Sequence, residues 1–210
     1  MAGLIELKAV DKRFYESRLR EFLPDRIIDI HTHIWLASDV ARRAPAGLPR
    51  TVTWPDRVAR DNPIGDLVET YRLLLPGKKV TPLVFGYPVE GGDLDTLNGY
   101  VASVAADRRL PAPGLTSPAW SAAELEDRVI AGGFLGVKPY LTCALAYLPA
   151  GEIRIHDFLP PHHLEVLDRH GWIAMLHIPR PGPEGLTRRD IEDILGNNGA
   201  RLFTGAVNKE

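Results

Sequence analysis

The chain has 210 residues, of which 45% are hydrophobic and 25% charged, and its formal net charge is −2. This length suits one well-buried domain over residues 1–210, and the composition is that of a globular protein in water. The charge balance argues against a surface for nucleic acid or anionic membrane, and the apolar runs are too short to span a bilayer. The single cysteine, Cys143, excludes an internal disulfide and fits a reducing compartment, so we expect a cytoplasmic protein.

The first third of the sequence predicts a helix, a strand and a long loop. The helix is expected over residues 12–22, with Asp11 as its cap and Pro24 after its end. The strand covers residues 26–30 and leads into two histidines. A polar loop rich in proline and arginine follows over residues 36–62, and a loop of this length is either disordered or a functional lid.

After this loop, helical and strand patterns alternate to the end of the sequence. Helices are predicted over residues 66–75, 94–109, 121–132, 161–170 and 187–195, and strands over 79–85, 113–116, 134–140, 172–178 and 200–204. The third of these helices opens with a capping box, Ser121 and Glu124. Regular alternation predicts an α/β fold with parallel strands and helices outside, either an open doubly wound sheet or a (β/α) barrel. No glycine-rich dinucleotide or phosphate loop follows a strand, which weakens the open-sheet alternative.

His31 and His33 stand one residue apart at the end of the first strand. Because side chains alternate along a strand, Asp29, His31 and His33 should share one face, opposite Ile28, Ile30 and Ile34. Neutral imidazoles are common ligands of zinc-like ions, so this pair is a candidate metal site. Asp29 is a candidate for orienting a metal-binding histidine by a hydrogen bond, without binding the metal itself. The alternative is a strand that simply ends in two exposed histidines.

Other polar residues also fall where predicted strands end. His177 ends the strand before Pro179, and three histidines from two strands would leave a fourth metal position for water, as in catalytic zinc sites. Lys138 and Tyr140 end the strand over residues 134–140, and both are candidates for contact with substrate. Arg180 is a candidate for binding a substrate carboxylate. His156, His162, His163 and His170 lie in a loop or at helix ends and are interpreted as solvated or, for His170, as a favourable charge at a helix C-terminus.

The order of these motifs resembles the amidohydrolase superfamily, and more closely its amidohydrolase-2 branch, over residues 20–200. The matching segments are residues 29–33 (Asp-Ile-His-Thr-His), 133–138 (Gly-Phe-Leu-Gly-Val-Lys) and 176–177 (Leu-His). The resemblance implies a barrel of the TIM type, a small-molecule substrate and a divalent metal, usually zinc. The metal would activate water against an amide, ester or lactone, or polarise a substrate that loses carbon dioxide. Some amidohydrolases carry a carboxylated lysine that bridges two metals, so Lys138 is a candidate for metal contact. The alternative is a lysine that pairs with a carboxylate or contacts a substrate acid.

The sequence also departs from the family pattern. A histidine at the end of strand six and an aspartate at the end of strand eight are expected in the family, but residues 201–207 read Arg-Leu-Phe-Thr-Gly-Ala-Val before the sequence ends at Glu210. We therefore expect a partial barrel of five to six βα units, and its uncovered edges predict a homo-oligomer or a separate C-terminal partner.

Three interpretations remain open because the family's proton acceptor has no counterpart in the sequence. The chain is a metal-dependent hydrolase or decarboxylase, a truncated metal-binding relative with little catalysis, or the N-terminal part of a complete enzyme. The catalytic base stays unassigned. We expect metal binding with little hydrolysis of simple esters, lactones or amides by this chain alone.

Overall fold

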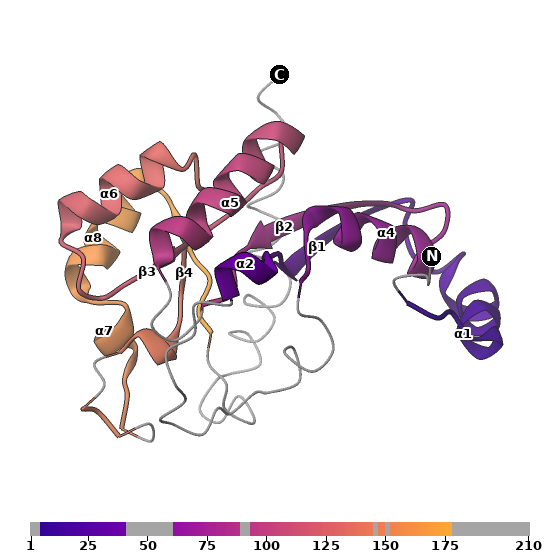
Figure 1. The fold of residues 1–210 in the computed structure, drawn as a ribbon, viewed down its shortest axis with the longest axis horizontal. Helices are drawn as coiled ribbons and strands as arrows, with labels where there is room; N and C mark the ends of the chain where they lie inside the picture. Colours follow the sequence, from indigo (N-terminus) through magenta and orange to yellow (C-terminus); the bar gives the residue numbers. More distant parts are fainter. Residues whose placement is uncertain (1–4, 41–60, 89–92, 145–146, 150–151, 178–210) are drawn as a thin grey trace. The chain divides into compact units, whose positions relative to one another are not determined.

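The computed structural model describes residues 5–40, 61–88, 93–144, 147–149 and 152–177 (Figure 1). The chain divides into two compact units, residues 1–178 and 179–210, and all described residues belong to the first unit. Arg180 and the helix and strand predicted over residues 187–195 and 200–204 therefore lie outside the described residues. Among the described helices, none is long and apolar enough to cross a membrane.

The strands of the described unit are all parallel to their neighbours and alternate with helices. β1 (Arg26–His33) pairs with β2 (Lys79–Phe85), and a second sheet has the order β3 (Gly114–Thr116), β4 (Gly136–Pro139) and β5 (Ile173–Ala174). The prediction of an α/β fold with parallel strands is confirmed. In the part of the chain described here, the strands form two small open sheets, and no closed barrel is seen.

Backbone hydrogen bonds also connect the segment before β3 to strands on both sides. The Val84 N–H of β2 donates to the Pro111 carbonyl oxygen over 3.0 Å, and the Leu135 N–H before β4 donates to the Ala112 oxygen over 2.9 Å. The two sheets thus meet along the segment that leads into β3. Neighbouring strands follow one another in chain order on both sides of this junction.

The helices of the described unit are short to medium in length. They are α1 (Ala9–Phe14), the π-helical η1 (Tyr15–Leu19), α2 (Ala37–Val40), α4 (Ile64–Leu74), α5 (Leu94–Arg108), α6 (Ala122–Ala131), the 3₁₀ turn η2 (Leu141–Cys143), α7 (Ile155–Phe158) and α8 (Pro161–His170). α6 and α8 lie side by side (Figure 1), and Arg169 of α8 forms an ion pair with Glu126 of α6. The helices that the sequence predicts over residues 66–75, 94–109, 121–132 and 161–170 are confirmed within two residues.

Local capping explains where one prediction succeeded and another failed. Ser121 and Glu124 form the predicted capping box: the Glu124 N–H donates to the Ser121 hydroxyl, and the Glu124 carboxylate accepts from the Ser121 N–H. The first helix begins at Ala9 rather than after Asp11, because the Asp11 carboxylate accepts from the Lys8 N–H and so belongs to the first turn.

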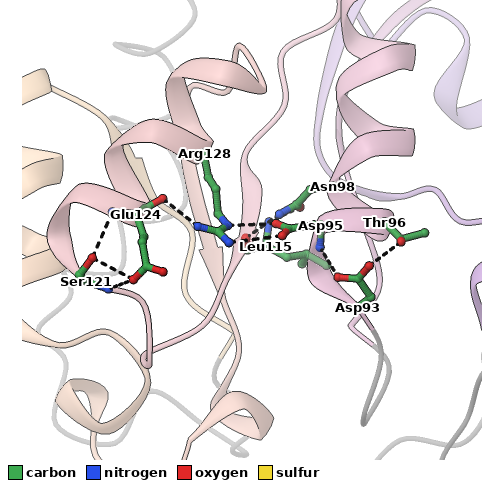
Figure 2. A network of polar contacts seen from close by, with 8 residues as sticks. All are labelled: Asp93, Asp95, Thr96, Asn98, Leu115, Ser121, Glu124 and Arg128. Atoms are coloured by element: carbon green, nitrogen blue, oxygen red, sulfur yellow. Dashed lines mark hydrogen bonds and ion pairs between the residues drawn. The ribbon is translucent and has the colours of Figure 1, made fainter.

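Polar contacts hold α5 against its neighbours (Figure 2). Arg128 of α6 forms an ion pair with Asp95 in the first turn of α5, with a 3.0 Å contact between Nε and Oδ1. The buried Asn98 side chain bonds both backbone groups of Leu115: its amide donates to the carbonyl oxygen over 2.9 Å, and its oxygen accepts from the N–H over 2.7 Å. Asn98 thereby attaches β3 to α5, since a buried backbone group needs such a partner.

The apolar core lies between the helices and the strands, and β1 contributes to it unevenly. Its most buried members include Ile34, Val84, Val101, Leu125, Phe158 and Val166. Ile28 and Ile30, expected on the same face as Ile34, remain 43% and 39% exposed. The pairing of β1 with β2 shifts register between Asp29 and Thr32, so one simple alternation does not describe the whole strand.

Candidate functional site

His31 and His33 lie together at the C-terminal end of β1, as the sequence predicts. Their ring centroids are 5.5 Å apart, and both rings contact the Phe85 ring at the end of β2, at 5.1 and 4.5 Å. Phe85 is fully buried and presents its ring to both imidazoles in edge-on geometry. The two histidines are thus held on one aromatic support at the carboxyl ends of two parallel strands.

The hydrogen bond of His33 determines which of its ring nitrogens is available to a ligand. Nδ1 lies 3.2 Å from the Gly86 carbonyl oxygen, which can only accept, so Nδ1 carries the proton in this bond. Nε2 is then the nitrogen with a lone pair. Such a bond to a backbone carbonyl is the usual way in which a metal-binding histidine is fixed in orientation and tautomer.

Asp29 bonds to the backbone of the histidine segment and to a tyrosine. Its Oδ1 accepts from the His31 N–H over 3.1 Å, and its Oδ2 accepts from the Tyr71 hydroxyl over 2.8 Å. Burial, and then the bond to Asp29, raise the pKa of Tyr71, which stays a phenol donor. Asp29 therefore fixes the backbone at His31, and its predicted role in orienting a histidine ring stays a prediction.

His177 follows β5 and lies beside the residues that follow β4. Its N–H donates to the Pro139 carbonyl oxygen over 3.3 Å, and a parallel bridge pairs it with Tyr140. The two rings pack with centroids 4.7 Å apart and planes at 32°. His177 therefore lies three residues beyond β5, which is shorter than the strand predicted over residues 172–178, and its ring packs against the Tyr140 ring.

All three histidines have a lowered pKa and are neutral imidazoles at neutral pH. Burial is the main cause in each case, and it lowers the pKa of His33, aided by the charge of His31, to about 3. For His31 and His177 the second cause is the charge of Lys138. The charge of His177 also acts on His33, so the four groups share one electrostatic environment. Neutral imidazole is the form that binds a metal ion.

Lys138 is fully buried in β4, and its ammonium group lies against aromatic rings. Nζ is 4.8 Å from the centroid of Phe85 and 5.6 Å from that of Tyr140. Within the described residues, Nζ has no hydrogen-bond partner. Burial alone lowers the pKa of Lys138 to about 8. The predicted contact of Lys138 with a metal or substrate stays a prediction, and its burial was not foreseen from the sequence.

The Tyr140 hydroxyl also lacks a partner among the described residues. The side chain is buried and 3% exposed, and burial raises its pKa, so the group remains a neutral donor. It lies two residues after Lys138 on the same strand end. Tyr140 and Lys138 thus offer unpaired donors within one aromatic surrounding.

The fit of a metal ion to these residues is mixed. The protonation states and the His33 tautomer suit a divalent cation. Yet within residues 5–40, 61–88, 93–144, 147–149 and 152–177, no three His, Cys, Asp or Glu side chains lie in position to hold one. Two imidazoles are adjacent, and the third donor is not in ligand geometry. No catalytic step can therefore be derived through a metal from this arrangement.

Some site residues could not be identified from the sequence. Phe85 contacts His31, His33 and Lys138, and Tyr87 contacts the His33 ring at 5.7 Å. The available signal was their position at and just after the end of a predicted strand, because carboxyl ends of parallel strands share one edge.

One histidine outside the site also differs from expectation. His163 is fully buried rather than solvated, and its Nε2 lies 2.8 Å from the Trp120 carbonyl oxygen, as the Nε2 of His162 does at 3.0 Å. It packs on the inner side of α8 and connects that helix to the segment before α6.

Comparison with known proteins gives no match to a family model, to a curated protein or to a solved structure.

Proposed function

We propose that this chain is a divalent-metal-binding protein, most suited to zinc, and a hydrolase or decarboxylase of the amidohydrolase type. His31 and His33 would bind the cation, with His177 as the third donor. The observation that carries the proposal is the bond of His33 Nδ1 to the Gly86 carbonyl, which leaves Nε2 to bind a cation beside the His31 ring.

The position of the site in the fold supports the proposal. The residues of the site lie at or just after the carboxyl ends of parallel strands: His31, His33, Phe85, Tyr140 and His177. Parallel α/β folds form their ligand sites at this edge. We further propose that the two open sheets, which meet before β3 and keep their strands in chain order, belong to a partial barrel.

The chemistry that a cation would supply is the polarisation of a substrate carbonyl or the activation of water. This chain's own contribution is to hold the imidazoles neutral by burial and to fix the His33 tautomer through Gly86. The His177 ring would have to move before it could act as the third ligand. A small-molecule substrate is expected, and the proton acceptor is unassigned.

Metal titration of the full chain tests the proposal. The protein is first dialysed against a chelator, and zinc binding is then measured by competition with a chromophoric chelator. We expect about one ion per chain, with affinity at least about tenfold weaker in His31→Ala and His33→Ala. His156→Ala is the matched control, because His156 is an exposed histidine on α7.

Two results would count against the metal site in different ways. Absence of zinc binding, or equal affinity in His33→Ala and the unaltered chain, overturns the proposal. Unchanged affinity in His177→Ala alone removes His177 from the ligand set and leaves the pair on β1 as the site.

A further inference from the structure

Lys138 stands apart from the other buried polar groups because it carries a full charge. Four buried side-chain atoms lack a hydrogen-bond partner in the described part of the chain: Thr116 Oγ1, Lys138 Nζ, Tyr140 OH and His163 Nδ1. Thr116, Tyr140 and His163 are neutral, so burying their polar atoms without a partner has a modest cost in free energy. A buried ammonium without a partner is far more costly, since desolvation disfavours the charged form.

A second buried lysine, Lys78, differs from Lys138 because its ammonium group has partners within the protein. The Lys78 side chain is 7% exposed, yet its Nζ donates to the Leu23 carbonyl oxygen over 2.8 Å and contacts the Asp25 carboxylate at 3.1 Å. No Asp or Glu of the described residues forms an ion pair with Lys138, and burial alone explains its lowered pKa of about 8. Such a group is still mainly protonated at neutral pH, so its charge lacks a counterion among the described residues.

Aromatic rings do not replace that counterion. Contacts with the faces of Phe85 and Tyr140 supply a weak attraction, which is smaller than the desolvation cost of an ammonium group. The histidines nearby are neutral and add no negative charge. No negatively charged acceptor in the described part of the chain bonds the Lys138 ammonium or the Tyr140 hydroxyl.

We propose that Lys138 and Tyr140 bind the carboxylate of an acidic small-molecule substrate. The inference rests on the proposed function in identifying this ligand as the substrate of the histidine site. A carboxylate has two oxygens, so one can accept from the ammonium and the other from the phenol. Both donors come from residues at and just after the end of β4.

This arrangement favours hydrolysis of an acidic substrate over loss of the bound carboxylate. An ammonium stabilises the carboxylate before the reaction, whereas loss of carbon dioxide moves that negative charge onto carbon. The group bound by Lys138 therefore serves to position the substrate and is retained in the product.

Benzoate binding to the metal-free full chain tests the inference, with benzamide as a neutral probe of the same shape. Removal of metal prevents direct binding of the carboxylate to a cation. Ligand-detected NMR should give benzoate affinity about ten- to hundredfold above that of benzamide, and Lys138→Met should remove this difference. Tyr140→Phe should weaken benzoate by a smaller factor. Lys78→Met is the matched control and should retain benzoate binding.

The outcomes separate this inference from the metal proposal. Equal binding of benzoate and benzamide, or undiminished benzoate binding in folded Lys138→Met, overturns the carboxylate site even if zinc binds. Benzoate binding that depends on Lys138 in a chain that fails to bind zinc supports the carboxylate site and overturns the metal proposal. Benzoate binding only after zinc is added overturns the inference, because the carboxylate then binds the metal.

Discussion

The Lys138 ammonium lies 4.8 Å from the centroid of the Phe85 ring, and this contact joins the end of β4 to the end of β2. The same ring contacts His31 and His33, so one phenylalanine touches both the buried cation and the histidine pair. A cation–π contact contributes about 0.5–2 kcal/mol, whereas the desolvation of an unpaired ammonium costs several kcal/mol. With the contacts of the described residues alone, the balance at Lys138 is therefore unfavourable to stability.

We predict that Lys138→Met stabilises the metal-free, ligand-free chain by about 2–4 kcal/mol at neutral pH. Methionine keeps an unbranched side chain of similar length and removes the buried charge. Urea denaturation measures the change in the free energy of unfolding. Lys78→Met should do the opposite, because it removes bonds to Leu23 and Asp25. A loss of stability in Lys138→Met as large as that in Lys78→Met would show that Lys138 has a partner within the protein.

We predict that acid destabilises the metal-free chain through the buried histidines. The pKa of His33 is about 3 in the folded chain against an ordinary value of 6.5. Between these values the unfolded chain binds a proton that the folded chain does not, so stability is full above pH 6.5 and falls as the pH decreases toward 3. The slope for one such histidine approaches about 1.4 kcal/mol per pH unit.

The lowered pKa values of His31 and His177 act in the same direction. Urea denaturation at a series of pH values from 7 to 4, with chelator present, measures the combined slope. His33→Gln should reduce that slope by close to one proton, since the glutamine has no proton to gain. An unchanged slope in His33→Gln would mean that His33 titrates normally in the folded chain.

Local signals in the sequence predicted much of the fold. β2 covers the same residues as the strand predicted over 79–85, and α6 begins at the capping box of Ser121 and Glu124. His31 and His33 share one side of the strand end because a two-residue period brings alternate side chains together. These features depend on neighbours within a few residues, and the sequence contains that information directly.

The features that the sequence did not predict depend on contacts between distant segments. The register shift in β1 arises in its pairing with β2, about fifty residues away, and the exposure of Ile28 depends on which distant segments cover that face. The burial of Lys138 and His163 is a tertiary effect, because helix or strand position alone does not tell whether a polar side chain is covered. Phe85 has no polar or reactive group, so its contact with the two histidines could not be predicted by looking for reactive residues.

Glycine at position 136 provides a final test of the β4–β5 geometry on which Lys138 depends. Gly136 has φ of +149°, and a Cβ there would lie 2.1 Å from the carbonyl oxygen of Ile173 on β5. Backbone atoms cannot yield as a side chain does, so we predict that Gly136→Ala destabilises the chain by about 2–4 kcal/mol.

Gly99→Ala is the matched control for this substitution. Gly99 lies within α5 with nothing within 4 Å of the added Cβ, so alanine should stabilise the chain by about 0.5–1 kcal/mol. The two variants change the unfolded chain in the same way, so their difference in free energy of unfolding isolates the clash in the folded state. Thermal and urea denaturation measure both. If Gly136→Ala proved as stable as Gly99→Ala, β4 and β5 would be farther apart than the structure places them, and the surroundings of Lys138 would have to be looser.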